Sequence, residues 1–193
     1  MHFLQYISSV IPVSDALDAE LHRITRVVEI ERNTCFMRQG DRCDDLYFVE
    51  EGLMRGYYYN EDKEITSWFS KEGEFATSFY SFITQRPTVE FAETLEDTVL
   101  VQLPYHSLQK LYRDFPETER LGRLLTEAYY IRLESRFLAM QFTTAKERYD
   151  ALLDTNPSLV NRAPLGCIAS YLGMTQETLS RIRAGGIKAQ KRS

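Results

Sequence analysis

Residues 165–184 read LGCIASYLGMTQETLSRIRA, a stretch that fits two short helices joined by a tight turn. Small Ala169 allows the two helices to approach, and Gly173 supplies the positive φ that a tight turn requires. Thr175 follows the turn as a suitable N-cap for the second helix. Apolar residues at helical spacing give both helices a buried face: Ile168, Leu172, Met174, Leu179 and Ile182. The stretch therefore predicts a helix-turn-helix.

The outward face of the second helix distinguishes a DNA-reading motif from an ordinary αα-hairpin, which needs the same glycine and apolar spacing. Arg181 can hold a guanine through two hydrogen bonds, and Glu177 can accept one from a cytosine amino group. For Arg181 and Arg183, favourable charge at a helix C-terminus is the alternative role. The predicted DNA-binding residues are Thr175, Gln176, Glu177, Ser180, Arg181, Arg183 and Lys188.

The distribution of charge supports this interpretation. The net charge of the 193-residue chain is −5, which by itself argues against nucleic-acid binding. From residue 141 onward, however, eight Lys and Arg face four Asp and Glu, a local balance of +4 that leaves −9 for residues 1–140. Positive charge is thus concentrated around the helix-turn-helix, as phosphate binding requires.

The amino-acid composition limits the classes of protein to which the chain can belong. With 44% hydrophobic and 26% charged residues, the chain resembles an ordinary globular protein with room for two small domains. No apolar run approaches the roughly 20 residues of a membrane helix, and the first fifteen residues do not read as a secretory signal. We therefore expect a cytoplasmic protein without a membrane partner.

The three cysteines, Cys35, Cys43 and Cys167, are odd in number and widely spaced. They suggest neither a disulfide framework nor a zinc site, and a four-cysteine iron–sulfur cluster is out of reach for one chain. We expect no metal and no resident cofactor.

Residues from about 27 to 104 read as short strands. Runs rich in β-branched and aromatic residues, such as LYFVE and LMRGYYYN, are separated by turn signals at Gly40, Gly52 and Gly73. Many short strands at nearly regular spacing are typical of a jelly roll or barrel. A helix is expected before them, beginning at the N-cap Ser14 and ending near Ile24.

After a break near Phe115-Pro116, a long helix carries apolar or small residues at alternating steps of three and four. A second stripe runs beside this seam from Leu125 to Met140, so one stripe can pack on the β domain while the other meets a second copy. The alternative is a helix buried wholly within one chain. Because helix-turn-helix proteins commonly read two half-sites, we favour a homodimer. The predicted interface residues are Leu121, Leu124, Ala128, Ile131, Ser135 and Leu138.

A further helix is expected from Thr144 to about Asp154, ended by Asn156-Pro157. Gly185-Gly186 are expected to end the recognition helix. The chain is therefore predicted to be α+β. Its parts are an N-terminal jelly-roll sensor domain (residues 1–112), a dimerisation helix (113–142) and an all-α helix-turn-helix domain (143–193).

This order of parts resembles the Crp/Fnr family of bacterial transcription regulators along essentially the whole chain. The segment GDRCDDLYFVEEG, residues 40–52, is similar to the glycine-bounded hairpin of the family's cyclic-nucleotide-binding-like domain. The C-terminal segments TAKERYDALLDTNPSL and IASYLGMTQETLSRIR are similar to those of Bacteroidetes members. The resemblance implies a dimer that binds double-stranded DNA, contacts RNA polymerase and responds to a small-molecule effector.

Two departures from the family pattern concern the recognition helix. Family members usually carry Arg-Glu at its start, whereas this chain has Gln176-Glu177, so a different operator sequence is expected. The wing hairpin that normally follows is replaced by GGIKAQKRS, and we expect Lys188, Lys191 and Arg192 to supplement the phosphate contacts.

A third departure concerns the effector. Members that bind cyclic AMP use a phosphate cassette with Gly-Glu before a short helix and Arg followed by Ser or Thr after it. Here Thr77 and Ser78 stand at the first place, and Arg86 is followed by Pro87. We therefore expect that the barrel does not bind cyclic AMP in the familiar way. It either binds another small molecule through Thr77, Ser78, Arg86 and Thr88 or binds none, these residues then being a solvated loop.

No pattern in the sequence indicates catalysis: His2, His22 and His106 lie far apart, and there is no glycine-rich phosphate loop. We expect a protein that is not an enzyme. The alternative to a DNA-binding regulator is a cyclic-nucleotide-binding signalling subunit that acts on a protein partner through its helical end.

Overall fold

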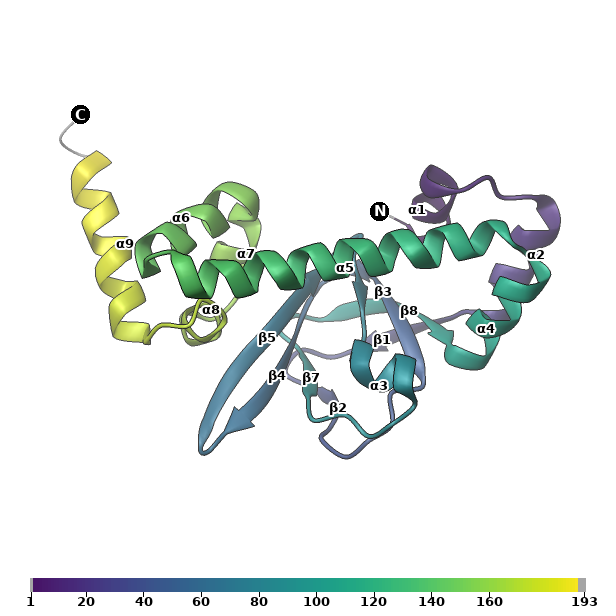
Figure 1. Cartoon of the computed structure of the whole chain (residues 1–193), viewed down its shortest axis with the longest axis horizontal. Helices are drawn as coiled ribbons and strands as arrows, with labels where there is room; N and C mark the ends of the chain where they lie inside the picture. Colours follow the sequence, from purple (N-terminus) through teal and green to yellow (C-terminus); the bar gives the residue numbers. More distant parts are fainter. Residues whose placement is uncertain (1, 191–193) are drawn as a thin grey trace. The chain divides into compact units, whose positions relative to one another are not determined.

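A computed structural model describes the backbone of residues 2–190 and the side chains of residues 2–185 (Figure 1). The fold is α+β, with an N-terminal β domain followed by a long helix and further helices, as predicted. The chain divides into two compact units, one made of Met1–Tyr58 and Trp68–Tyr129, the other of Tyr59–Ser67 and Tyr130–Ser193. A compact unit need not fold independently, so these units do not test the domain boundaries predicted after residues 112 and 142. Those boundaries stay a prediction.

Two helices precede the strands. Helix α1 (Phe3–Val10) was not predicted; it is short and buries Phe3 and Ile7. Helix α2 (Asp15–Ile24) begins as predicted at Ser14, whose hydroxyl accepts a hydrogen bond of 3.2 Å from the Leu17 N–H.

The strands form two four-stranded sheets, in the orders β1-β8-β3-β6 and β2-β7-β4-β5. We call the two sheets together the β-roll. Strand β4 follows β3 after one glycine, Gly52, whose φ of +98° fits the predicted turn. The strands are β1 (Arg26–Ile30), β2 (Cys35–Met37), β3 (Asp45–Glu51), β4 (Leu53–Asn60), β5 (Lys63–Lys71), β6 (Phe75–Ala76), β7 (Phe91–Thr94) and β8 (Thr98–Pro104).

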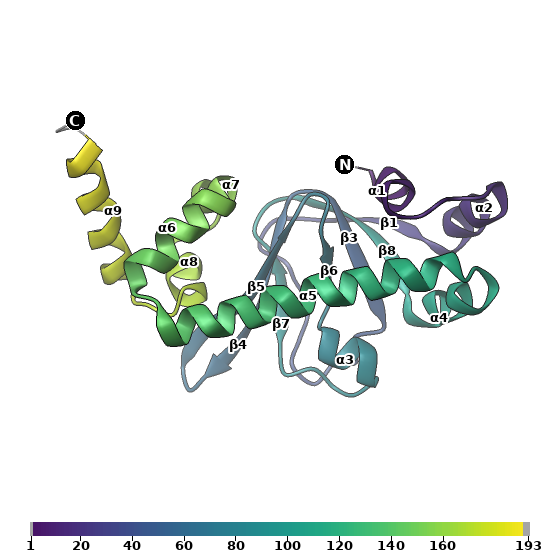
Figure 2. The same cartoon turned by 45° about the horizontal axis from the view of Figure 1, so that its top comes forward.

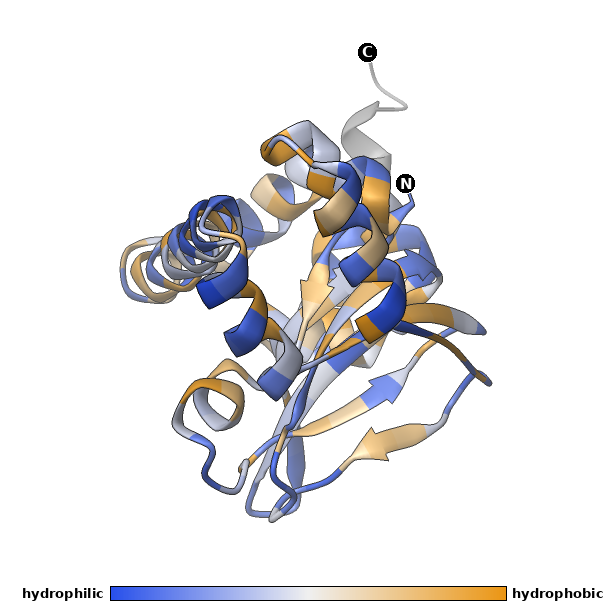
Figure 3. Ribbon diagram, turned by 90° about the vertical axis from the view of Figure 1, so that its right-hand side faces the viewer, coloured by the Kyte–Doolittle hydropathy of each residue, from blue (hydrophilic) through white to orange (hydrophobic). Residues whose placement is uncertain are grey.

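The interior of the β-roll is an apolar cluster contributed by both sheets. Its buried members are Val49, Met54, Ala76 and Leu100, and half-buried aromatic side chains pack against them. In Figure 3, hydrophobic segments appear on strands and helices alike, and the loops that join the strands are mainly hydrophilic. Burial of this kind is the main stabilising contribution in such a domain.

The opposite face of β3 belongs to a second cluster. Leu46 and Phe48 alternate with the inward-facing residues and pack with α1, α2 and α4 (Tyr105–Asp114). The start of α5 (Glu117–Phe142) joins this cluster through Leu121. A small apolar cavity of about 20 Å³ remains among these side chains.

Helix α3 (Phe79–Thr84) connects β6 to β7, and neither α3 nor β6 was predicted. The ring of Phe79 stacks on Tyr129 of α5, with 4.1 Å between ring centroids and planes 25° apart. Figures 1 and 2 both show α3 beside this part of α5. Stacking of two rings holds the short helix in place.

The second unit contains the end of α5 and four further helices: α6 (Ala145–Thr155), α7 (Pro157–Arg162), α8 (Leu165–Tyr171) and α9 (Gln176–Gln190). Thr144 and Glu147 form a capping box that starts α6 where the sequence predicted. The prediction that Gly185-Gly186 end the last helix was wrong, because α9 continues to Gln190. Glycine in a helix costs about 1 kcal/mol but causes no steric clash, so it permits the helix to continue. In the part of the chain that is described, no helix combines the length and hydropathy needed to span a membrane.

Candidate DNA-binding unit and effector site

The turn between α8 and α9 has the geometry of a helix-turn-helix. Gly173 adopts the predicted positive φ, +64°. The N–H of Gly173 donates to the Ser170 carbonyl, and the N–H of Met174 donates to the Ala169 carbonyl, each at 3.0 Å. These bonds satisfy the last carbonyls of α8. Ala169 is buried where the helices meet, as its small size predicted.

This turn is fixed by the neighbouring helices. A Cβ atom at Gly173 would lie 2.7 Å from the sulfur of Met140, so the turn packs directly on the end of α5. The guanidinium of Arg148, on α6, donates from Nε to the Leu172 carbonyl at 2.8 Å. The two contacts hold the turn against α5 and α6.

The first turn of α9 is capped by the residue that the sequence indicated. The N–H of Thr178 donates to the hydroxyl of Thr175 at 3.2 Å. Hydrogen bonds from its own backbone N–H and from the Thr175 hydroxyl hold the pKa of Glu177 below its usual value, so this carboxylate is ionised at neutral pH. In the free protein Glu177 therefore helps to cap the helix.

Helix α9 has one buried apolar face and one exposed polar face. Leu179 is fully buried, whereas Gln176, Ser180 and Arg181 are exposed. Arg183 is half-buried, and Thr175 and Glu177 are exposed at the start of the helix. The side chain of Lys188, together with Lys191 and Arg192, lies outside the part of the chain that is described. A contact of these residues with DNA stays a prediction.

The tip of the β4–β5 hairpin belongs to this unit, which the sequence did not indicate. The N–H of Thr66 donates to the hydroxyl of Ser170 at 2.8 Å, and that hydroxyl donates to the Glu64 carbonyl at 3.0 Å. Thr66 is fully buried. The hydroxyl of Ser170, on α8, therefore both accepts a hydrogen bond from strand β5 and donates one to it.

Arg136 of α5 makes a second connection to the same strand. Its guanidinium donates to the carbonyls of Ser67 and Thr66, the latter at 3.0 Å. It also lies over the ring of Tyr171 on α8, with 4.6 Å to the centroid. Helices α5 and α8 and the hairpin tip are thus joined around one arginine.

The predicted dimer residues lie in different surroundings. Ala128, Ile131, Ser135 and Leu138 are exposed on α5, and Leu124 is half-buried. Leu121 is only 8% exposed and packs in the cluster with α1 and α2, which leaves little of its side chain for a second copy. The heptad spacing identified residues on one helix face, but the β domain covers the beginning of that face. Other exposed apolar residues of α5 were not assigned to the interface: Tyr130, Leu133, Phe137 and Phe142.

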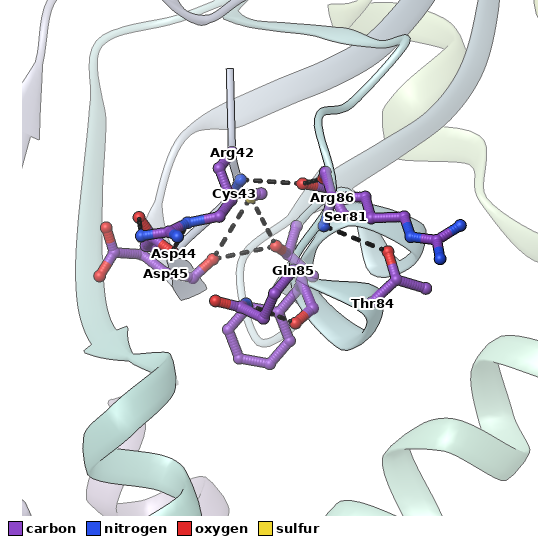
Figure 4. Close-up of polar contacts among 10 residues, drawn as sticks. Arg42, Cys43, Asp44, Asp45, Ser81, Thr84, Gln85 and Arg86 are labelled. Carbon is purple, nitrogen blue, oxygen red and sulfur yellow. Dashed lines mark hydrogen bonds and ion pairs between the residues drawn. The ribbon is translucent and has the colours of Figure 1, made fainter. Parts of the chain in front are cut away.

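Three of the four predicted effector residues are buried and bonded within the protein. The Thr88 hydroxyl donates to that of Ser78 at 2.9 Å. The Thr77 hydroxyl donates to the Asp45 carbonyl at 2.9 Å and lies 3.0 Å from the Cys43 sulfur. Arg86 is exposed, and Figure 4 shows its guanidinium pointing away from Cys43 and Asp45. The structure brings Thr77, Ser78 and Thr88 together but not Arg86.

A polar cavity of about 510 Å³ lies beside this group, and none of the four predicted residues lines it. An ion pair between Arg42 and Asp44, at 2.7 Å, crosses its rim. Burial raises the pKa of the Cys43 thiol and, more strongly, the pKa of the Tyr47 hydroxyl, so both stay protonated at neutral pH. The cavity is lined by Phe36, Met37, Asp41, Arg42, Cys43, Asp44, Asp45 and Tyr47.

Comparison with known proteins identifies one matching domain and several similar proteins. A model of the cyclic nucleotide-binding domain matches residues 27–115. The fumarate and nitrate reduction regulatory protein of Vibrio cholerae is 27% identical over 183 residues, which cover 86% of this chain and 72% of that protein. The anaerobic regulatory protein of Haemophilus influenzae is 23% identical over 182 residues, covering 86% and 70%. The chain thus carries a cyclic nucleotide-binding domain and is similar over most of its length to bacterial transcription regulators of the Crp/Fnr type.

Two solved structures share the fold of this chain. FixK2 from Bradyrhizobium japonicum superimposes with a TM-score of 0.75 at 20% identity, covering 86% of each chain. The c-di-GMP-responsive global regulator CLP from Xanthomonas campestris gives a TM-score of 0.70 at 17% identity, covering 92% of this chain and 93% of that one. The resemblance predicted from the hairpin and the helix-turn-helix is confirmed; its Bacteroidetes character stays a prediction.

Within the described residues of the regulator, no cluster of three or more His, Cys, Asp or Glu is arranged to hold a metal ion. The relatives that the chain matches are named as regulatory proteins. The matched domain includes the whole cassette, from β6 through α3 to β7. Which small molecule the domain can bind therefore depends on the residues that surround this cassette.

Proposed function

We propose that the regulator reads DNA as a homodimer, with α9 of each copy in the major groove. The observation that carries the proposal is the exposed polar face of α9, held by a helix-turn-helix whose turn is fixed on α5 and α6. A recognition helix needs a side-chain array presented at a fixed angle, because base-edge hydrogen bonds tolerate little misplacement. The buried Leu179 and the capped first turn support such a fixed presentation.

Arg181 is the residue that we assign to base recognition. It is exposed in the second turn of α9, and its Nε donates weakly, at 3.4 Å, to the Glu177 carbonyl one turn earlier. The guanidinium has further donors in a fork that matches the O6 and N7 acceptors of guanine. Gln176 at the start of the helix offers an amide that can pair with adenine.

The exposed apolar residues of α5 support dimerisation. Apolar side chains continue the heptad seam beyond the part that the β domain covers, ending with Phe142, which is 81% exposed. An exposed stripe of this kind on one helix is typical of a contact with a second copy. Regulators of the family act as dimers, and two copies present two recognition helices about one helical turn of DNA apart. RNA polymerase is the further protein partner that we propose.

For the sensor domain, we propose that cyclic AMP is not bound in the familiar way. The cassette hydroxyls of Thr77, Ser78 and Thr88 are engaged with protein atoms, and the exposed Arg86 points outward. A nucleotide phosphate at this place would have to break those buried hydrogen bonds. Any effector is thus expected to differ from cyclic AMP in its contacts.

A mobility-shift titration with double-stranded DNA tests the proposal. We expect salt-sensitive binding that selects some sequences over others, with the protein bound as a dimer. The alternative is a signalling subunit that acts on a protein partner. It predicts no sequence selection at any salt concentration, and that result would overturn the proposal.

A further inference from the structure

The only tryptophan of the sequence, Trp68, lies on β5 and reaches into the β-roll. It packs against the interior cluster of both sheets and against a neighbouring cluster of Met37, Cys43 and Ala92. Its Nε1 atom is buried and is the one buried side-chain nitrogen or oxygen without a hydrogen-bond partner among the described residues. An indole N–H in such a position is energetically costly, so its place is not explained by polar bonding.

Gly56 on the adjacent strand β4 makes room for this indole. A Cβ atom at Gly56 would lie 2.1 Å from Cε2, 2.2 Å from Nε1 and 2.5 Å from Cζ2 of Trp68. These distances are far shorter than van der Waals contact, so a Cβ atom at Gly56 would force the half-buried indole to move. Only glycine fits beneath the ring, which means that the indole edge rests directly on the β4 backbone.

The clusters against which the indole packs include residues that flank the cassette in the chain. Ala76 directly precedes Thr77-Ser78, and it belongs to the first cluster that Trp68 contacts. Ala92 follows the cassette on β7 and belongs to the second. Cys43 of that second cluster is itself in contact with the Thr77 hydroxyl, 3.0 Å away. The bicyclic ring of Trp68 therefore packs against apolar clusters whose members flank the cassette in the chain.

We infer that Trp68 is the specificity-determining residue of the β-roll: its indole occupies the space that the planar base of a nucleotide effector would need. The inference deepens the proposed function, because it rests on the sensor domain proposed above and identifies what limits its ligands. A purine is a planar bicyclic ring like indole, and a base that entered the apolar interior of the roll would meet the ring of Trp68 there. Protein interiors are close-packed, so a base and the indole cannot share the apolar space that the ring fills.

The wild-type protein allows a first test, since Trp68 is the sole tryptophan and its fluorescence reports on this place alone. We expect emission typical of an apolar environment, weak quenching by acrylamide, and no change when cyclic AMP or cyclic GMP is added to 1 mM, a concentration on the order of 1,000 times a micromolar Kd. Micromolar binding of either nucleotide by calorimetry, or free access of acrylamide to the indole, would overturn the inference.

The Trp68→Ala variant gives the second test. Removing the ring leaves an apolar cavity, and we expect the melting temperature to fall by about 10 °C. Added indole should restore several degrees by filling the space, since apolar cavities bind matching apolar ligands. The matched control is Trp68→Phe, which keeps most of the ring volume and should gain no stability from indole.

Indole that stabilises the alanine and phenylalanine variants equally, or neither of them, would contradict the inference. If the alanine variant does not fold, Trp68→Leu leaves a smaller cavity and is compared with Trp68→Phe in the same way. DNA binding of the wild-type protein is measured in parallel. If the wild-type protein does not bind DNA, the proposed function is overturned, and the result for indole is unaffected. If DNA binding is intact but the indole test fails, only the inference about Trp68 is overturned.

Discussion

Arg181 is the residue on which the proposed base recognition most depends. It is exposed on α9 and makes one weak contact with its own helix, so its removal should not disturb the fold. For Arg181→Ala we predict a loss of about 1–3 kcal/mol of discrimination between the preferred DNA sequence and a mismatched one, on the order of 10- to 100-fold. Binding to unrelated DNA should change far less, because it depends on phosphate contacts.

The measurement is a competition titration with matched and mismatched DNA. The control is Lys146→Ala, which also removes one positive charge but lies on α6, where Lys146 pairs with Asp150. Unchanged sequence preference after Arg181→Ala, or the same change after Lys146→Ala, would contradict the assignment.

Glu20 gives a prediction for stability against pH. Two side-chain hydrogen bonds from Arg23, at 2.6 and 2.7 Å, lower the pKa of Glu20 to about 2. A carboxylate with a depressed pKa in the folded state stabilises the fold above the pKa of the unfolded chain, near 4.5, and that contribution is lost as the pH falls toward 2. We therefore predict that Glu20→Gln lowers the free energy of unfolding at pH 7, by an amount that shrinks between pH 4.5 and 2.

Urea titrations at several pH values check this prediction. Glu29→Gln, which removes an exposed carboxylate on β1, is the matched control for the loss of one negative charge. A Glu20→Gln effect that is the same at pH 7 and at pH 2 would show that the carboxylate does not act through its charge.

Not every functional side chain could be predicted from the sequence. Thr175 and Gly173 could, because a cap and a positive-φ turn residue have strong local requirements. Ser170 and Arg136 could not, because their partners on β5 are 104 and about 70 positions away in the chain. Nothing local in the sequence distinguishes such a serine from one that faces solvent.

At the level of elements, the connection between the β4–β5 hairpin and α8 is the most specific feature. For Ser170→Ala we predict a loss of about 1–3 kcal/mol of stability, because the buried Thr66 N–H loses its partner. Hydrogen exchange at the Thr66 amide should accelerate in the same variant. Denaturant titration and exchange measured by mass spectrometry test both effects.

The control is Ser9→Ala, where an exposed hydroxyl bonds only to the Tyr6 carbonyl of its own helix. It should change neither quantity appreciably. Faster exchange at Thr66 in both variants, or in neither, would show that the Ser170 hydroxyl does not hold the hairpin.

The strands and helices that could be predicted were those whose apolar residues recur at a clear period along the sequence. Strand β4 matches its predicted run LMRGYYYN, and α6 begins at its predicted cap. Helices α1 and α3 and strand β6 are too short to show a period, and their apolar residues are fixed by tertiary packing. The long heptad seam identified one face of α5 but not the domain that covers its beginning.

For the whole molecule, the proposed dimer makes the strongest prediction. Leu138→Glu places a charge on the exposed seam of α5, where a second copy would bury it, and should convert the dimer to a monomer. Affinity for a two-half-site DNA should fall by at least tenfold, because one copy then contacts one half-site. Analytical ultracentrifugation and DNA titration measure the two effects.

Thr126→Glu is the matched control, since Thr126 is exposed on the same helix but outside the heptad seam. It should leave the oligomeric state unchanged. A monomeric wild-type protein, or dissociation by both substitutions, would contradict the interface assigned here.

The order of domains and the family were predictable because each part has its own signature in the sequence, from the glycine-bounded hairpin to the helix-turn-helix. The effector site was not, because its character depends on what fills the β-roll. Trp68 on β5 and Gly56 on β4 are unremarkable when read separately, and only the fold places the indole on the glycine.

Selection from random double-stranded DNA with the wild-type protein tests the central claim most directly. A dimer that reads DNA with two copies of α9 should enrich an inverted repeat whose half-sites lie about 10 base pairs apart, centre to centre. Binding to the selected DNA should weaken steeply with salt, as expected for phosphate contacts. Failure to enrich any sequence, or enrichment of a single unrepeated site, would contradict the account.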